Sequence, residues 1–183
     1  PEQRGFIFWE GSQRYFTGMP RPELPPGMTS VGVFVDAPPE TVLDSISRYN
    51  LGGIQLHGGE SPGYCQALKK HLKQGGYKGI ELIKAFPVGV GFSFQELEPY
   101  LSVCDYFLFD TKGELPGGTG RTFDWEVLRD YPYAKPFFLS GGIGESHCGK
   151  LIEFAGSPQA RYCVGIDVNS RFENAPGAKD TEA

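Results

Sequence analysis

Two kinds of residue stand where buried strands are expected to end and could do chemistry there. Asp110 closes the apolar run 106–109, and an apolar setting favours the neutral form of a carboxyl group, which suits a general acid. A helix cap or a loop ion pair would use an aspartate equally well. Gly141-Gly142 and Asn169-Ser170 follow the next two apolar runs, and unobstructed backbone N–H groups bind phosphate dianions. A Gly-Gly pair alone is usually a turn, but two such loops on consecutive strands predict a phosphate site.

Further polar residues occupy similar positions on other runs. Arg14 follows the first apolar run, His57 ends the run 53–56, and Asp167 ends the last. Each also has an ordinary interpretation: an exposed loop arginine, a hydrogen-bonded structural histidine, and an aspartate that anchors the next loop. Lys84 ends another run, and its amine points either into the site or to a neighbouring carboxylate.

The composition is that of an acidic, folded domain. The chain has 183 residues with a formal net charge of −5, and hydrophobic residues make up 39%. This length predicts one domain over residues 1–183, because single cores extend to about 250 residues. The acidic balance argues against a nucleic-acid partner, which needs a basic face. No apolar run reaches the roughly 18 residues of a membrane span, so no membrane partner is expected.

The four cysteines, Cys65, Cys104, Cys148 and Cys163, stand far apart. They form no CxxC pair and have no histidine at zinc spacing, so no metal site is predicted. A disulfide scaffold is not expected at this length. We interpret the cysteines as reduced thiols of a cytoplasmic protein. The sequence leaves open whether that protein is a monomer or a homodimer.

Short apolar runs alternate with helical patterns along the chain. Such runs are typical of parallel strands buried on both faces, and they cover residues 5–9, 31–35, 53–56, 80–86, 106–110, 137–141 and 163–168. Asp36 is expected to cap a helix that buries Val42 and Ile46, and Ser61 to cap the next. Ser93 and Glu96 form a capping-box pair, and helical patterns recur at 125–128 and 147–154.

This repetition predicts an α/β fold with a parallel sheet, either open and doubly wound or closed as a (β/α)8 TIM barrel. The glycine-rich turns come late in the chain, where barrels bind phosphate, so we favour the barrel. Seven strands are one short of eight. We therefore expect the first βα unit to lie before Pro1 and the last helix after Ala183. Residues 176–183 resemble the start of that helix.

Several segments, in order, resemble the phosphoribosylanthranilate isomerase family and together span nearly the whole chain. Single pieces are weak signals, but the full series in family order is specific. The segments include Gly5-Phe-Ile-Phe8, Gln55-Leu-His-Gly58, Ile83-Lys-Ala-Phe86, Gly117-Gly-Thr-Gly120, Ser140-Gly-Gly-Ile143 and Gly165-Ile-Asp-Val168. The resemblance implies a TIM barrel that performs an Amadori rearrangement on N-(5-phosphoribosyl)anthranilate, a small phosphorylated substrate, without metal or organic cofactor.

The resemblance also implies roles for single residues. Asp110 would be the general acid, Arg14 would bind the anthranilate carboxylate, and Asp167 would lie beside the anthranilate amine. His57 would lie near the substrate and bind it. The segment 118–120 would shape the loop over the substrate.

One part of the family pattern has no counterpart in these 183 residues. The family's base is a cysteine in a Lys-x-Cys-Gly motif on the first strand, and none of the four cysteines has that context. We therefore expect these residues alone to be inactive. The alternatives are a non-catalytic phosphoribosyl-binding barrel and a phosphate-binding barrel enzyme with other chemistry.

Overall fold

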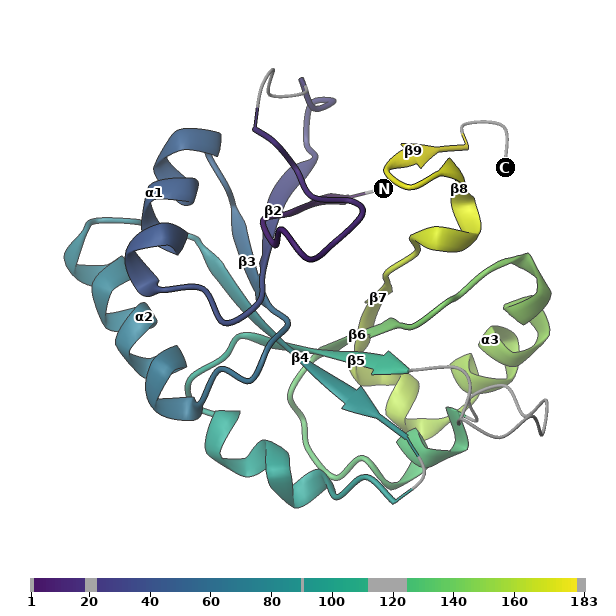
Figure 1. Ribbon diagram of the computed structural model, residues 1–183. Coiled ribbons are helices and arrows are strands. Elements are labelled where there is room, and N and C mark those ends of the chain that lie inside the picture. The colour runs from purple at the N-terminus through teal and green to yellow at the C-terminus, as the bar shows by residue number, and fades with distance from the viewer. Residues whose placement is uncertain (1, 19–22, 90, 112–124, 181–183) are drawn as a thin grey trace. The chain divides into compact units, whose positions relative to one another are not determined.

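A computed structural model describes residues 2–18, 23–89, 91–111 and 125–180 (Figure 1). The segment 118–120, which was expected to shape a loop over the substrate, lies outside these residues. The chain divides into two compact units. The first comprises Pro1–Ala85 and Pro99–Asp105, and the second comprises Phe86–Glu98 and Tyr106–Ala183.

The first unit is a set of parallel strands joined by helices. Its strands are β1 (Gln3–Ile7), β2 (Thr29–Phe34), β3 (Gly53–Leu56) and β4 (Glu81–Val88), paired in chain order, and the end of β4 belongs to the second unit. All three pairings are parallel, so the carboxyl ends of the strands lie at one edge. Strand β3 is buried along its whole length, as expected for a parallel strand covered on both faces.

The helices of the first unit are α1 (Pro39–Tyr49) and α2 (Pro62–Gln74), which Figure 1 shows on the same side of its strands. The predicted cap of α2 is confirmed, because the Tyr64 N–H donates to Ser61 Oγ at 3.2 Å. The predicted cap of α1 is wrong. Pro38 stands at that position without a side-chain cap, and Asp36 adopts a left-handed backbone with φ of 50°. The Asp36 carboxylate instead accepts the Gly59 N–H at 2.7 Å.

The apolar faces of these elements form the core of the first unit. Val42 and Ile46 of α1 are buried as predicted. Fully buried residues from the strands and from α2 complete it: Phe34, Ile54, Leu56, Leu68 and Leu82. Burying one such side chain stabilises the fold by about 1.5–3 kcal/mol relative to leaving it exposed.

The second unit also has parallel strands, β5 (Tyr106–Thr111), β6 (Phe137–Ser140) and β7 (Cys163–Ile166), paired in that order. Its regular α-helix is α3 (Cys148–Ala155). Short 3₁₀ helices also occur in the described part of this unit: η2 (Trp125–Asp130), η3 (Glu145–His147), η4 (Pro158–Tyr162) and η5 (Ser170–Phe172). Packed aromatic rings dominate its core, with the Phe109 and Phe137 ring centroids 4.9 Å apart.

The capping-box pair Ser93 and Glu96 predicted a helix, and η1 (Phe94–Tyr100) occupies that place. It is a 3₁₀ helix that contains Pro99. A proline within a helix removes an N–H donor and clashes with the preceding turn, which limits a regular α-helix.

The prediction of a helix start at 176–183 is wrong for its described part. Residues there form an antiparallel hairpin of β8 (Glu173–Ala175) and β9 (Ala178–Lys179). Gly177 lies in the turn with φ of 83°, which a glycine adopts without strain. The Pro176-Gly177 pair therefore serves a hairpin turn rather than a helical first turn.

The seven predicted parallel strands are confirmed, with ends shifted by two residues or fewer. In the described part of the chain, no helix is long and apolar enough to cross a membrane. The first βα unit and last helix, and the single domain over 1–183, stay predictions.

Candidate functional site

The carboxyl ends of β5, β6 and β7 bring two of the predicted acidic residues to one edge of the second unit. Asp110 pairs in register with Ser140 on the neighbouring strand. The Ser140 hydroxyl donates to Asp167 Oδ2 at 3.0 Å. The Asp167 N–H in turn donates to the Leu139 carbonyl at 2.8 Å, which fixes the backbone just beyond β7. Ser140 thus neighbours Asp110 in the sheet and hydrogen-bonds Asp167, a role that sequence reasoning missed.

The two predicted phosphate-binding loops extend from the same edge. Gly141 and Gly142 follow β6 with φ of 106° and 67°, a backbone that favours glycine. Asn169 and Ser170 follow β7 and are exposed, and η5 begins at Ser170. A Cβ added at Gly144 would lie 2.9 Å from Arg171 Cβ, so the loops after β6 and β7 lie against each other.

The β8–β9 hairpin fixes the second of these loops. The Lys179 ammonium donates to Asn169 Oδ1 at 2.6 Å and to Glu173 Oε1 at 3.0 Å. It also reaches the Asn169 carbonyl at 3.3 Å. The hairpin therefore holds the carbonyl side of the Asn169 turn, while the backbone N–H groups of this turn carry the predicted phosphate contact.

Arg14 and His57 belong to the first unit, and the other six predicted site residues belong to the second. Arg14 follows β1 and is half-buried, and its N–H donates to Ser12 Oγ at 3.1 Å. His57 follows β3, where its N–H donates to the Phe34 carbonyl at 2.8 Å. Both therefore extend from the carboxyl ends of parallel strands, the end at which α/β barrels carry their active sites.

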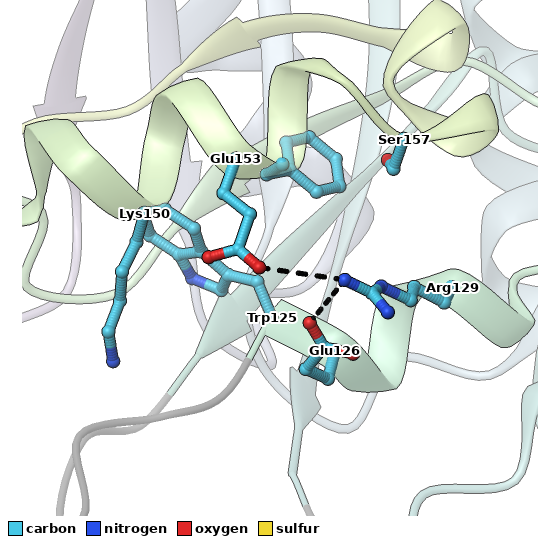
Figure 2. Close-up of a pocket in the computed structure, with 7 residues that line it drawn as sticks. Trp125, Glu126, Arg129, Lys150, Glu153 and Ser157 are labelled. Carbon is cyan, nitrogen blue, oxygen red and sulfur yellow. Dashed lines mark ion pairs between the residues drawn. The ribbon is translucent and has the colours of Figure 1, made fainter.

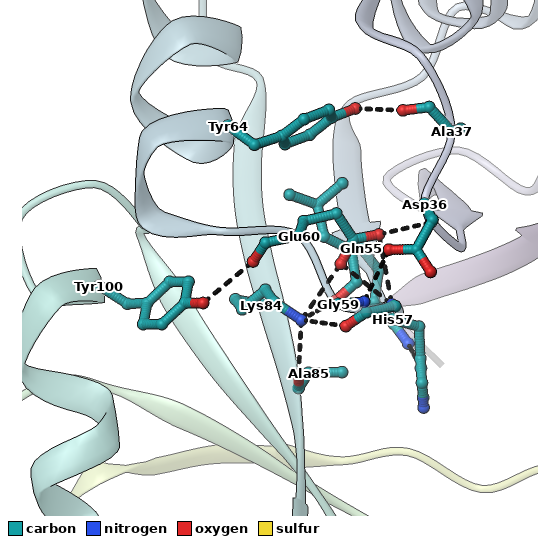
Figure 3. Close-up of polar contacts among 12 residues, drawn as sticks. Asp36, Ala37, Gln55, His57, Gly59, Glu60, Tyr64, Lys84, Ala85 and Tyr100 are labelled. Carbon is teal, nitrogen blue, oxygen red and sulfur yellow. Dashed lines mark hydrogen bonds and ion pairs between the residues drawn. The ribbon is translucent and has the colours of Figure 1, made fainter.

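A buried ion pair lies beside His57 (Figure 3). Lys84 Nζ and Glu60 Oε2 are 3.2 Å apart, and their side chains are only 3% and 1% exposed. Of the two directions left open for the Lys84 amine, the structure shows the one toward a neighbouring carboxylate. The sequence alone assigns no role to Glu60, because a glutamate in a glycine-rich turn carries no local signal of burial.

The four thiols do not lie at the strand ends that carry the candidate site. Cys65 and Cys104 are fully buried, and a hydrogen bond to Cys65 together with burial raises the pKa of the Cys104 thiol. Cys163 begins β7, at its amino end, and burial raises the pKa of this thiol too. Cys148 is exposed at the start of α3. Among the described residues, no group of three or more His, Cys, Asp or Glu could hold a metal ion.

A small pocket in the second unit lies apart from these residues, between η2 and α3 (Figure 2). Arg129 crosses it with one nitrogen 2.6 Å from Glu126 and 3.6 Å from Glu153. None of the predicted site residues is among those that line it: Trp125, Glu126, Arg129, Lys150, Glu153, Phe154 and Ser157. Its arginine is already paired with two carboxylates, Glu126 and Glu153.

The chain is similar to known proteins both in sequence and in structure. A family model described as N-(5'-phosphoribosyl)anthranilate (PRA) isomerase matches residues 2–183. The isomerase of that name from Parabacteroides distasonis is 40% identical, with 97% of this chain matched to 78% of that protein. The crystal structure of phosphoribosyl anthranilate isomerase from Thermotoga maritima is 32% identical with a TM-score of 0.74, covering 99% of this chain and 83% of that one. Another phosphoribosyl anthranilate isomerase structure, in complex with reduced 1-(o-carboxyphenylamino)-1-deoxyribulose 5-phosphate, is 30% identical with a TM-score of 0.71, covering 99% and 82%.

Proposed function

This chain belongs to the N-(5'-phosphoribosyl)anthranilate isomerase family, enzymes of tryptophan biosynthesis, and from that premise we propose its reaction and the residues that perform it. The reaction is the Amadori rearrangement of N-(5'-phosphoribosyl)anthranilate to 1-(o-carboxyphenylamino)-1-deoxyribulose 5-phosphate. It needs an acid that protonates the ribose ring oxygen and opens the ring. It then needs a base that removes the C2 proton of the resulting iminium.

One observation in the second unit supports this assignment above the others. Asp110 is in register with Ser140, and Ser140 holds Asp167, so two carboxylates share one edge beside the glycine loop. We assign Asp110 as the general acid and Asp167 to the anthranilate amine. A fixed pair of carboxylates at the carboxyl edge of parallel strands suits a substrate that needs a proton donor and an amine partner.

The phosphate group is assigned to the loops that follow β6 and β7. The backbone N–H groups of Gly141, Gly142, Asn169 and Ser170 would bind its oxygens. The glycine backbone and the exposure of the second loop support this contact.

The anthranilate ring is assigned to the first unit. Arg14 would bind the carboxylate of anthranilate through two parallel N–H groups, the geometry that a guanidinium favours. His57 would contact the substrate through the imidazole nitrogen that faces away from its own strand. Both assignments rest on the position of these residues at the ends of β1 and β3 and on the family resemblance.

The base of the reaction is assigned to none of the four cysteines. Cys65 and Cys104 are buried free thiols that hydrogen-bond to each other, and Cys163 lies at the amino end of its strand. Cys148 begins α3, after the loop assigned to phosphate. A base must come within hydrogen-bond reach of the C2 proton, which these positions do not favour.

Asp110→Asn in the full-length enzyme tests the proposed function. We expect kcat to fall by ~10²–10⁴-fold, the usual contribution of general acid catalysis, with little change in product binding. Steady-state kinetics and product titration measure the two quantities. Asp130→Asn is the matched control, because Asp130 is exposed at the end of η2 in the same unit, and its kinetics should match the unmodified enzyme.

Two outcomes would contradict this proposal. Near-normal turnover by the Asp110→Asn enzyme would remove Asp110 from the role of acid. Tight binding of the product by the unmodified full-length protein without any turnover would favour the non-catalytic phosphoribosyl-binding barrel instead.

A further inference from the structure

We propose that Lys84 and Glu60 are positioning residues that act through His57, holding the turn after β3 so that the His57 ring meets the substrate. The inference rests on the substrate contact proposed for His57. It goes beyond that contact, because neither Lys84 nor Glu60 is assigned to touch the substrate.

The Lys84 ammonium binds backbone carbonyls on both sides of His57 (Figure 3). Its Nζ donates to the carbonyl of Leu56 at 3.3 Å and to that of Gly58 at 2.8 Å, the residues on either side of His57. It also donates to the carbonyl of Ala85 on its own strand at 2.9 Å. One cation from β4 therefore fixes both peptide groups that flank the histidine.

The Glu60 carboxylate binds backbone N–H groups of the same turn and of Asp36. Its Oε2 accepts the Gly58 N–H at 3.0 Å, and its Oε1 accepts the Asp36 N–H at 2.9 Å. Asp36 returns the contact, because its Oδ1 accepts the Gly59 N–H at 2.7 Å. The turn is thus tied to the end of β2 as well as to β4.

The His57 ring itself is oriented by its own strand. Gln55 Nε2 lies 2.8 Å from His57 Nδ1, and an amide nitrogen can only donate. Nδ1 then accepts this hydrogen bond from the side chain two residues earlier on the same strand. With the backbone held by Lys84 and Glu60, this hydrogen bond fixes the orientation of the ring.

Stability alone gives little reason for such a pair. Two charges taken out of water lose solvation that their attraction only partly restores, and apolar replacements are often neutral or stabilising. Here both charged side chains are almost fully buried. Most of their hydrogen bonds go to backbone groups of the turn 56–60. The geometry therefore points to fixing the turn rather than to strengthening the fold.

The test compares four forms of the full-length enzyme: the unmodified protein, the pair variant Glu60→Gln with Lys84→Met, His57→Ala, and all three changes together. Changing both partners avoids leaving one buried charge unpaired. We expect the pair variant to lose on the order of 10- to 100-fold in kcat/KM, since misplacement by about 1 Å costs that much. In the His57→Ala background the same two changes should have no further effect.

The second readout is the imidazole signals in a ¹⁵N–¹H spectrum, which the three histidines of this chain make easy to assign. The pair variant should shift the His57 signals and leave those of His71 and His147 in place. Glu60→Asp serves if the pair variant does not fold, because it keeps the charge and shortens the side chain by one methylene. Lys69→Met is the matched control: it removes a half-exposed ion pair with Asp105 in the same unit, 2.6 Å long, and should change neither readout.

The outcomes separate this inference from the proposed function. Losses that multiply in the His57→Ala background would overturn the inference, because the pair would then act independently of His57. Unchanged kcat/KM and unchanged His57 signals in the pair variant would also overturn it, while the Asp110→Asn result would stand. If His57→Ala alone had normal kinetics, the substrate contact proposed for His57 would be wrong and this inference would fall with it.

Discussion

At the scale of single residues, Tyr64 joins α2 to the loop that follows β2. Its hydroxyl donates to the Ala37 carbonyl at 2.6 Å. Burial and the nearby Glu60 carboxylate raise the pKa of Tyr64 from 10.0 to about 12. Because the folded protein holds this proton more tightly than the unfolded chain, the hydroxyl links stability to pH.

The sign of that linkage gives a prediction. The contribution of Tyr64 is fully present below pH 10 and is lost as the pH rises through about 12, since the unfolded chain ionises first. Tyr64→Phe should cost about 0.5–1.5 kcal/mol at neutral pH, the value of one hydrogen bond. It should also flatten the fall of stability at alkaline pH. Urea unfolding at a series of pH values measures both, and an unchanged alkaline slope would contradict the assignment.

The sequence was enough to predict which polar residues stand at strand ends, but not which side chains they contact. Asp110 and Asp167 were predicted because each closes an apolar run, and register brings both to Ser140. The burial of Glu60 and its pairing with Lys84 depend on residues 24 positions apart, which no local pattern encodes. Asp36 failed as a helix cap because its carboxylate accepts the Gly59 N–H, again a contact across the chain.

At the scale of elements, the loop after β6 gives a prediction about phosphate. Gly142 has φ of 67° and open space where a Cβ would lie, so Gly142→Val brings backbone strain and a side chain facing solvent. We expect KM to rise more than kcat falls, because a ground-state contact is lost. In crystals grown with sulfate, an anion should lie between Gly142 and Ser170 in the unmodified protein.

Gly76→Val is the matched control for this prediction. Gly76 has φ of 75° and the same open surroundings, but it lies in the turn after α2. Both changes should destabilise the protein by about 1–2 kcal/mol, the cost of a left-handed residue with a side chain. Only the change at Gly142 should alter KM. Equal effects on KM would show that the loop after β6 does not bind phosphate.

Element boundaries followed the sequence where a strand is buried on both faces and departed from it at the surface. The limits of β3 matched the prediction, and all four of its residues are buried. The hairpin at Glu173–Lys179 was mistaken for a helix start, since a Pro-Gly pair is compatible with both structures. The Lys179 contacts that favour the hairpin come from Asn169 and Glu173, outside that pair.

At the scale of the whole molecule, the order of strands and the late glycine loops were enough to predict an α/β barrel family. The similarity to solved isomerase structures over 99% of the chain supports that fold. The sequence could do this because strand–helix repetition at nearly constant spacing is a property of the whole chain. No local sequence pattern states how many strands a barrel contains. The eighth strand therefore stays a prediction.

The activity of the 183 residues alone is a prediction at the same scale. We expect no isomerase turnover, because none of the four thiols lies where the base is needed. A fluorescence assay of substrate loss measures this, and binding of the product by the same preparation shows that the protein has folded. Measurable turnover would place the base within these residues and overturn the assignment.

The close approach of Gly144 and Arg171 has a consequence for recombining this enzyme with its relatives. Any side chain at Gly144 would meet the Arg171 stem within 3 Å, so the residue accepted at one position depends on the residue present at the other. A chimera with a crossover between Gly144 and Arg171 would combine two loops from different proteins, whose side chains need not fit together. Blocks exchanged among homologues should therefore keep residues 141–171 together, and libraries with crossovers inside that block should contain fewer folded members.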